Sequence, residues 1–273
     1  QLHIQSSRGT QDMNATWLAV FIAALSGGIV AKLIDYPVDW IKYYFGQRKS
    51  AKALVDAHLD PLLKAADAIV GKTSSLADRD FSVAAQQQGL AFTAALDSDL
   101  IGLTHLYARF WGRINILAEE SLGVSLASDK RGAKLQKIIA CLGSPQVRLV
   151  NRTHQNAIGE LTTEPSYDGR QRTIGLVEFG KKISEDSSAI AWCKPLFSLL
   201  EKTHIKATRQ QLLVYGVVAH ALVDTLDPKH QSTHPRPPYD SKLSKSAKRQ
   251  IEHLVFGEYL KGTDANNRYT KGQ

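Results

Sequence analysis

The feature that most constrains this chain is an uncharged, largely apolar run near its N-terminus. The run covers residues 15–31 and contains no acidic or basic side chain. A helix of this length lies at the lower end of what crosses the hydrocarbon core of a bilayer. The next residues lengthen it if the Lys32 side chain reaches the headgroups. We therefore predict one transmembrane helix over residues 15–34.

The residues that flank this run are of the types that favour a membrane interface. Five aromatic residues are predicted to be interface anchors, because their rings tolerate the headgroup region: Trp17, Tyr36, Trp40, Tyr43 and Tyr44. Basic residues follow the run closely, whereas Arg8 is the one basic residue before it. The positive-inside rule then predicts an inner-membrane, single-pass protein with its N-terminus outside and its bulk in the cytoplasm.

Two alternatives for the run stay open, a cleaved signal peptide and a helix buried in a globular core. A signal peptide carries its basic residues before the apolar run, and here they follow it. A short run that contains Gly27 and Gly28 also suits a buried helix. The aromatic and basic flanks favour the membrane interpretation. Residue 1 is glutamine and Met13 is the single methionine, so translation from Met13 would leave few residues before the span.

Small residues recur at every fourth position of the predicted span. They are Ala19, Ala23, Gly27 and Ala31. On a helix such residues form a shallow stripe along which two backbones can approach closely. The stripe therefore predicts a homo-oligomer that associates through the membrane helix. The alternative is that alanine and glycine are simply frequent in such helices.

The remainder of the chain predicts an all-α fold, a helical bundle on the cytoplasmic side. Apolar residues recur at helical spacing in the following segments: 52–70, 100–122, 134–142, 147–161, 174–183, 190–200 and 210–226. We expect Pro37 and Gly46 to interrupt the helix that leaves the membrane. Residues 162–172 have the composition of a loop, and no segment shows the alternation typical of strands.

These patterns divide the chain into five predicted parts. They are a short extracytoplasmic tail over 1–14, the span over 15–34, an aromatic and basic juxtamembrane segment over 35–50, a helical cytoplasmic domain over 51–228, and a basic, partly disordered tail over 229–273. That tail contains nine basic and four acidic residues. The surplus suits an anionic partner such as nucleic acid, or it is simply a solvated surface.

The motifs that suggest metals or cofactors lack the context that those sites need. Cys141 and Cys193 lie far apart without a CxxC motif, and Glu201 with His204 forms a single copy of a motif that di-iron bundles use twice. Residues 66–73 match a loose phosphate-binding loop, but a helical pattern precedes them where a strand is needed. We therefore expect neither a metal nor a cofactor. His220, four residues before an aspartate, is expected to be a core histidine with its hydrogen bonds satisfied.

One heptad suggests catalysis. Residues 148–154, Arg-Leu-Val-Asn-Arg-Thr-His, resemble HEPN ribonucleases in the spacing of arginine and histidine. The resemblance implies that His154 acts as a general acid or base on RNA and that Arg148 stabilises a phosphate. Leu149 departs from that family, in which a polar residue usually follows the arginine. The alternative is an arginine and a histidine on a solvated helix face.

Three further segments resemble uncharacterised bacterial single-pass membrane proteins with a helical cytoplasmic domain. They are residues 59–67, 108–117 and 154–160, and the resemblance implies no particular function. We therefore predict a non-enzymatic, membrane-anchored interaction or assembly module. Two alternatives stay open: a HEPN-like ribonuclease or defence protein that uses Arg148 and His154, and nucleic-acid binding through the basic tail.

Overall fold

The computed structural model describes residues 9–81, 98–262 and 268–270, with side chains from residue 42 onward. The described residues are mostly helical with two short strands, which confirms the predicted all-α class. Contacts divide the chain into two compact units, Gln1–Ser50 and Ala51–Gln273.

The first helix, α1 (Gly9–Asp78), is much longer than the sequence predicts. It continues through Pro37 and Gly46, so the expected interruption there is wrong. A proline costs a helix one backbone hydrogen bond and a local bend, but it ends the helix only where nothing else stabilises it. At Pro61 the compensation is visible, since the neighbouring apolar side chains are buried in the core: Val55, Leu59, Leu62, Leu63 and Ala66.

The predicted span lies outside the residues whose side chains are described. This applies to residues 15–34 as a whole, including the small-residue stripe of Ala19, Ala23, Gly27 and Ala31, and to the anchors Trp17, Tyr36 and Trp40. Where side chains are described, from residue 42 onward with gaps at 82–97 and 263–267, none of the helices combines the length and the apolar character that crossing a bilayer needs. The span and its stripe therefore stay predictions.

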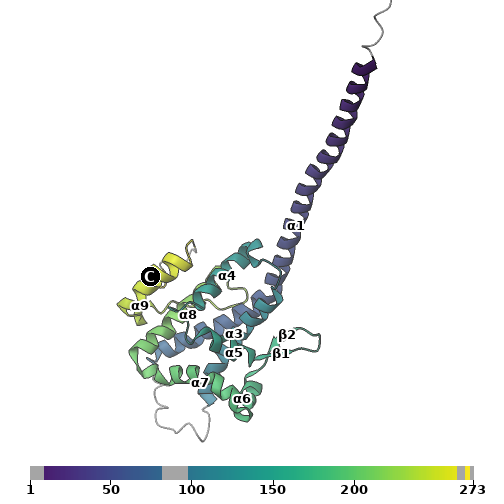
Figure 1. Cartoon of the computed structure of the whole chain (residues 1–273). Helices are drawn as coiled ribbons and strands as arrows, with labels where there is room; N and C mark the ends of the chain where they lie inside the picture. Colours follow the sequence, from purple (N-terminus) through teal and green to yellow (C-terminus); the bar gives the residue numbers. More distant parts are fainter. Residues whose placement is uncertain (1–8, 82–97, 263–267, 271–273) are drawn as a thin grey trace, which may run out of the picture. The chain divides into compact units, whose positions relative to one another are not determined.

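The second unit is built from helices that share one hydrophobic core (Figure 1). In chain order after α1 they are α3 (Ser98–Glu120), α4 (Lys130–Leu142), α5 (Arg152–Glu160), α6 (Leu176–Glu185), α7 (Ser187–Glu201) and α8 (Lys206–Leu226). Helix α8 is central, because every residue from Leu212 to Val223 is buried. It packs on α4, while α3 packs on α5, α6 and α7.

Side-chain caps fix where several of these helices begin. The carboxylate of Asp129 accepts hydrogen bonds from the backbone N–H groups of Arg131 and Gly132 at the start of α4. Asn151 caps α5 through the N–H of His154, and Asp186 caps α7. Each cap satisfies donors that the first helical turn leaves unpaired. The helix predicted over 147–161 therefore begins only after Asn151.

Helices α3 and α5 approach each other closely through two glycines. A Cβ atom at Gly159 would lie 2.9 Å from the backbone nitrogen of Gly112, and one at Gly112 would lie 2.4 Å from the Thr162 hydroxyl oxygen. A larger residue at either position would therefore push the helices apart. At this contact the Asn115 side-chain amide donates to the carbonyl of Asn156 over 2.9 Å.

A short hairpin replaces part of the predicted loop over 162–172. Strand β1 (Thr163–Pro165) pairs antiparallel with β2 (Gln171–Thr173). Gly169 has φ +77°, a conformation that glycine adopts at little cost, and it closes the turn. Three-residue strands are too short to produce the alternation by which strands are recognised in a sequence.

Much of the predicted C-terminal tail packs on the helical core. Its elements are a 3₁₀ turn (Asp240–Lys242), α9 (Lys245–Arg249) and a π-helix, η4 (Gln250–Tyr259). Apolar residues on one side of these elements are buried: Leu243, Ala247, Ile251, Val255, Phe256 and Leu260. Basic residues between them mask this apolar face in the composition of the segment. The π-helix η4 packs on α4, and α9 packs on α8 (Figure 1).

Candidate functional site

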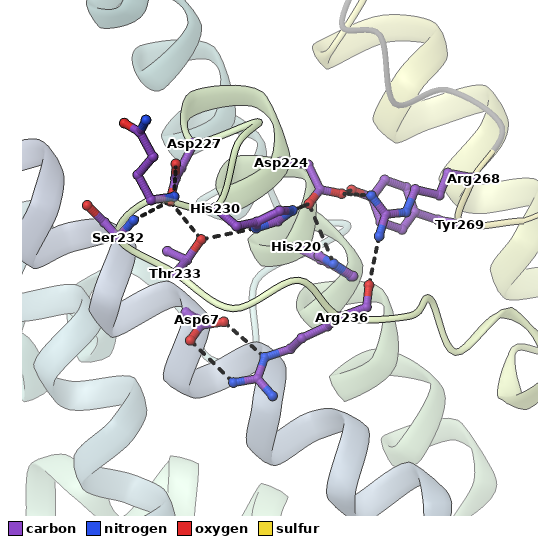
Figure 2. Close-up of polar contacts among 11 residues, drawn as sticks. Asp67, His220, Asp224, Asp227, His230, Ser232, Thr233, Arg236, Arg268 and Tyr269 are labelled. Atoms are coloured by element: carbon purple, nitrogen blue, oxygen red, sulfur yellow. Dashed lines mark hydrogen bonds and ion pairs between the residues drawn. The ribbon is translucent and has the colours of Figure 1, made fainter.

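A polar network lies where the C-terminal segment meets α8, and we call it the Asp224 network (Figure 2). Asp224 stands in the last turn of α8. One of its carboxylate oxygens accepts a hydrogen bond from the Tyr269 hydroxyl and lies 3.0 Å from Nη1 of Arg268. The other oxygen lies 3.7 Å from Nε2 of His220 and 3.6 Å from Nε2 of His230. The carboxylate thus contacts two imidazoles, a guanidinium and a phenol.

The turn after α8 is organised by a second carboxylate, that of Asp227. It accepts hydrogen bonds from the backbone N–H groups of Gln231 and Ser232 and from the Thr233 hydroxyl, at 2.8–2.9 Å. Burial opposes the charge on Asp227, but these donors outweigh it and lower the pKa of the carboxyl group. Nδ1 of His230 lies 3.2 Å from the same hydroxyl, so this turn orients the imidazole toward Asp224.

A third carboxylate, that of Asp67, ties the C-terminal segment to α1. Nε and Nη2 of Arg236 donate to its two oxygens over 2.9 and 3.2 Å, a bidentate pair, and Nδ1 of His234 lies 2.9 Å away. Burial raises the pKa of Asp67, but these partners outweigh it and the net shift is downward. Gly71 makes room for the pair, because a Cβ there would lie 2.7 Å from the guanidinium of Arg236.

His220 is the most enclosed titratable group of the Asp224 network, with 1% of its side chain exposed. Burial lowers its pKa to about 4, despite the opposing effect of Asp224, so the imidazole is neutral at neutral pH. Its ring packs edge-on against Tyr269 at 5.2 Å between centroids. The histidine is buried as the sequence predicts, but among the described residues neither ring nitrogen has a hydrogen-bond partner, contrary to the expectation that both are satisfied.

The chemistry open to this arrangement is limited by its enclosure. The side chains of His220, Asp224 and His230 are 1%, 11% and 16% exposed, and Arg268 balances the charge of the carboxylate. Within the described ranges, no three His, Cys, Asp or Glu side chains are placed to hold a metal ion together. The geometry suits a structural role, in which these polar contacts fix residues 227–236 and 268–269 on the helices.

The predicted catalytic pair occupies a different part of the unit. Arg148 lies in the loop before α5, and its carbonyl accepts a hydrogen bond from Gln211. His154 lies in the first turn of α5, where its Nδ1 is 2.7 Å from the side-chain oxygen of Asn151. Its ring packs edge-on against Trp192. These contacts orient His154 toward the cap and α7, and the catalytic role of the pair stays a prediction.

The other motifs have structural roles. Residues 66–73 lie inside α1, where no phosphate-binding turn exists. His204 contacts the backbone carbonyl of Glu201 and not its carboxylate. Cys141 and Cys193 are buried, which raises the pKa of each thiol to about 12.

The sequence did not reveal the Asp224 network as a unit. Its members come from two stretches of chain, residues 220–230 and 268–269, and in the neighbouring pair Asp67 is separated from Arg236 by 169 positions. The one local signal is the change, after Leu226, from an apolar helix to a segment rich in proline and histidine. That signal locates the turn but not its partners on α1.

Comparisons with known proteins found no similar chain: no family model matches, and neither does any curated protein or solved structure. A function for this protein is therefore argued from its own residues and their geometry.

Proposed function

We propose that the protein is a membrane-anchored, non-enzymatic interaction or assembly module, with its N-terminus outside and its helical unit in the cytoplasm. One observation carries the proposal. In the juxtamembrane segment, beyond the end of the predicted span at residue 34, Tyr43, Tyr44 and Phe45 expose 67%, 48% and 61% of their surface. A run of exposed aromatic side chains is unfavourable in water and favourable among lipid headgroups.

The directions of these three side chains fit a surrounding layer of lipid headgroups better than the surface of one protein partner. Successive residues on an α-helix point about 100° apart, so three in a row cover a wide arc of α1. A protein partner on one side would bury one or two of them, whereas a headgroup layer surrounds the whole helix. The exposed cations of Arg48 and Lys49 follow one turn later, where anionic headgroups would attract them.

The polar chemistry of the helical unit supports a role other than catalysis. In the Asp224 network the charged groups bind one another and fix the C-terminal segment. The nucleic-acid alternative is weakened by similar pairing, because basic residues of the tail are bound to carboxylates: Arg236 to Asp67, Arg268 to Asp224, Lys242 to Asp80 and Lys248 to Asp240. Pairing leaves less positive charge for phosphates.

The first test is alkaline carbonate extraction of membranes from cells that express the full chain. The wild type is expected in the pellet, and a variant with Ile22→Arg and Leu25→Arg in the supernatant, since each arginine at the centre of a span costs about 2.5–3.5 kcal/mol. The matched control places the same two charges at exposed apolar positions, Leu122→Arg with Val177→Arg, and is expected in the pellet. Release of the wild type would contradict the anchor.

The second test is cysteine labelling, which measures the orientation. The native thiols of Cys141 and Cys193 are buried with raised pKa, so they are expected to react slowly with maleimides. In a bacterial host, a membrane-impermeant maleimide is expected to label Ser6→Cys in intact spheroplasts. It is expected to label Tyr167→Cys, at a fully exposed hairpin position, only after lysis. The reverse pattern would contradict the predicted orientation.

A further inference from the structure

The C-terminal residues 268–270 pack against the buried histidine of α8 (Figure 2). The ring of Tyr269 lies edge-on to the imidazole of His220, and each of these residues is 1% exposed. The Tyr269 hydroxyl donates to the carboxylate of Asp224, and the Arg268 guanidinium pairs with the same carboxylate. The polar attachment of this segment to α8 therefore depends on one acidic side chain.

Several polar atoms of this contact are sealed from solvent without a hydrogen bond. Among the residues that the structure describes, they are both ring nitrogens of His220, Oδ1 of Asp224 and Nε of Arg268. Oδ1 of Asp224 lies 3.7 Å from Nε2 of His220 and 3.6 Å from Nε2 of His230, and both distances are too long for a hydrogen bond. A sealed polar group without a partner costs free energy, which it recovers when water reaches it. Opening of the segment would return hydrogen bonds to all of these groups.

The charges around His220 oppose a proton on its ring while the segment is in place. The charged and titratable groups that face it are Asp224 on α8, His230 and Arg236 in the segment after α8, and Arg268 and Tyr269 at the C-terminal end. With a neutral imidazole, Arg268 balances the charge of Asp224. A proton on His220 would place a second cation beside the same carboxylate, in a space without water. The closed arrangement therefore excludes this proton.

We propose that residues 268–270 are an acid-sensitive latch: protonation of His220 releases them from α8, and the imidazolium replaces Arg268 as the cation beside Asp224. Once the latch opens, water reaches the imidazole, which then binds a proton as an ordinary histidine does. Each opening takes up one proton from solvent at this residue. A proton that binds only the open form stabilises that form, so a fall in pH shifts the equilibrium toward it. The latch is independent of membrane anchoring.

The size of the effect follows from the two protonation equilibria of His220. Burial holds its pKa at about 4 in the closed form, against an ordinary value of 6.5 when water surrounds the ring. The ratio of open to closed latch is therefore expected to rise about 30-fold between pH 7.5 and pH 5.0. The helices stay folded over this range, because only the contacts of residues 268–270 are lost.

The experiment measures how fast a thiol introduced by Thr270→Cys reacts in the full chain in mild detergent. Thr270 is 3% exposed, and its hydroxyl has no hydrogen-bond partner in the described part of the chain, so sulfur there loses no hydrogen bond. The reagent is a dithiodipyridine, which reacts in acid as well as at neutral pH, and each rate is divided by that of free cysteine at the same pH. This ratio is expected to rise about 30-fold from pH 7.5 to pH 5.0. The buried thiols of Cys141 and Cys193 are expected to react more slowly at both pH values, since they need the helices to open.

The same assay is repeated with further substitutions added to Thr270→Cys. His220→Leu and His220→Gln do not titrate, so each is expected to reduce the rise to less than about threefold. Because one replacement is apolar and the other polar, a folding failure of one leaves the other as the test. His253→Gln removes an exposed histidine of η4 and is expected to keep the full rise. Arg268→Gln is expected to raise the rate at pH 7.5, because the closed latch loses its ion pair with Asp224.

Three results would overturn the proposal. One is a change of less than about threefold between the two pH values while His220 is present. Another is a full rise that persists in both His220 variants, which would assign the effect to a different group. The third is an introduced thiol that reacts no faster than Cys141 and Cys193, because residues 268–270 would then open only when the whole unit unfolds.

Discussion

Replacing Asp67 with leucine is expected to destabilise the helical unit by about 3–5 kcal/mol, the usual effect of removing one partner from a buried ion pair. The Asp67 carboxylate is 9% exposed and binds Arg236 through two hydrogen bonds, while Arg236 itself is 29% exposed. Leucine would leave the guanidinium partly buried beside an apolar side chain. The C-terminal segment would then lose its attachment to α1.

Urea unfolding of the full chain in mild detergent measures this effect, with Glu185→Leu on α6 as the control. Glu185 lies 3.9 Å from Lys181, but both side chains are mostly exposed, so this change is expected to stay within about 0.5 kcal/mol. Adding Arg236→Met to Asp67→Leu should restore most of the stability, because neither charge is then left alone. A loss below 0.5 kcal/mol for Asp67→Leu would show that the pair does not hold the segment.

Local sequence patterns predicted the helices well where apolar residues dominate a long stretch of chain. Helix α8 is an example, since its apolar residues from Leu212 to Val223 form a run that is buried on all sides. Helix α3 follows from the helical spacing of its large side chains, and the end of α4 from Gly143 with the proline that follows. These features are properties of ten to twenty consecutive residues, which is the range over which periodicity is informative.

The same local rules failed where distant contacts decide the outcome. The interruption expected at Pro37 and Gly46 does not occur, since α1 continues through both residues. The sequence predicts a partly disordered tail with only a weak amphipathic helix over residues 243–255, whereas the apolar face of residues 243–260 packs on α4 and α8. The pair of Asp67 with Arg236 was unpredictable for the same reason, because Arg236 could pair with any acidic residue until the fold selects Asp67.

The stability of the helical unit is expected to fall by up to about 3 kcal/mol as the pH is lowered from 6.5 to 4, because of His220. Its pKa is about 4 in the folded protein and about 6.5 in an unfolded chain. Between these values the unfolded state binds a proton that the folded state excludes, so the free energy of unfolding decreases as the pH decreases. The lowered pKa values of Asp67 and Asp227 act mainly below pH 4, outside this window.

The measurement is urea unfolding of the wild type and of His220→Leu at several pH values between 7 and 4. The groups that face the imidazole stay in place in the variant, namely Asp224, His230, Arg268 and Tyr269. The slope of stability against pH in this window should therefore be reduced by His220→Leu, whatever the variant does to stability at pH 7. His204→Leu removes an exposed histidine and should leave the slope unchanged. Equal slopes for the wild type and His220→Leu would mean that the buried imidazole accepts its proton as readily as a solvated one.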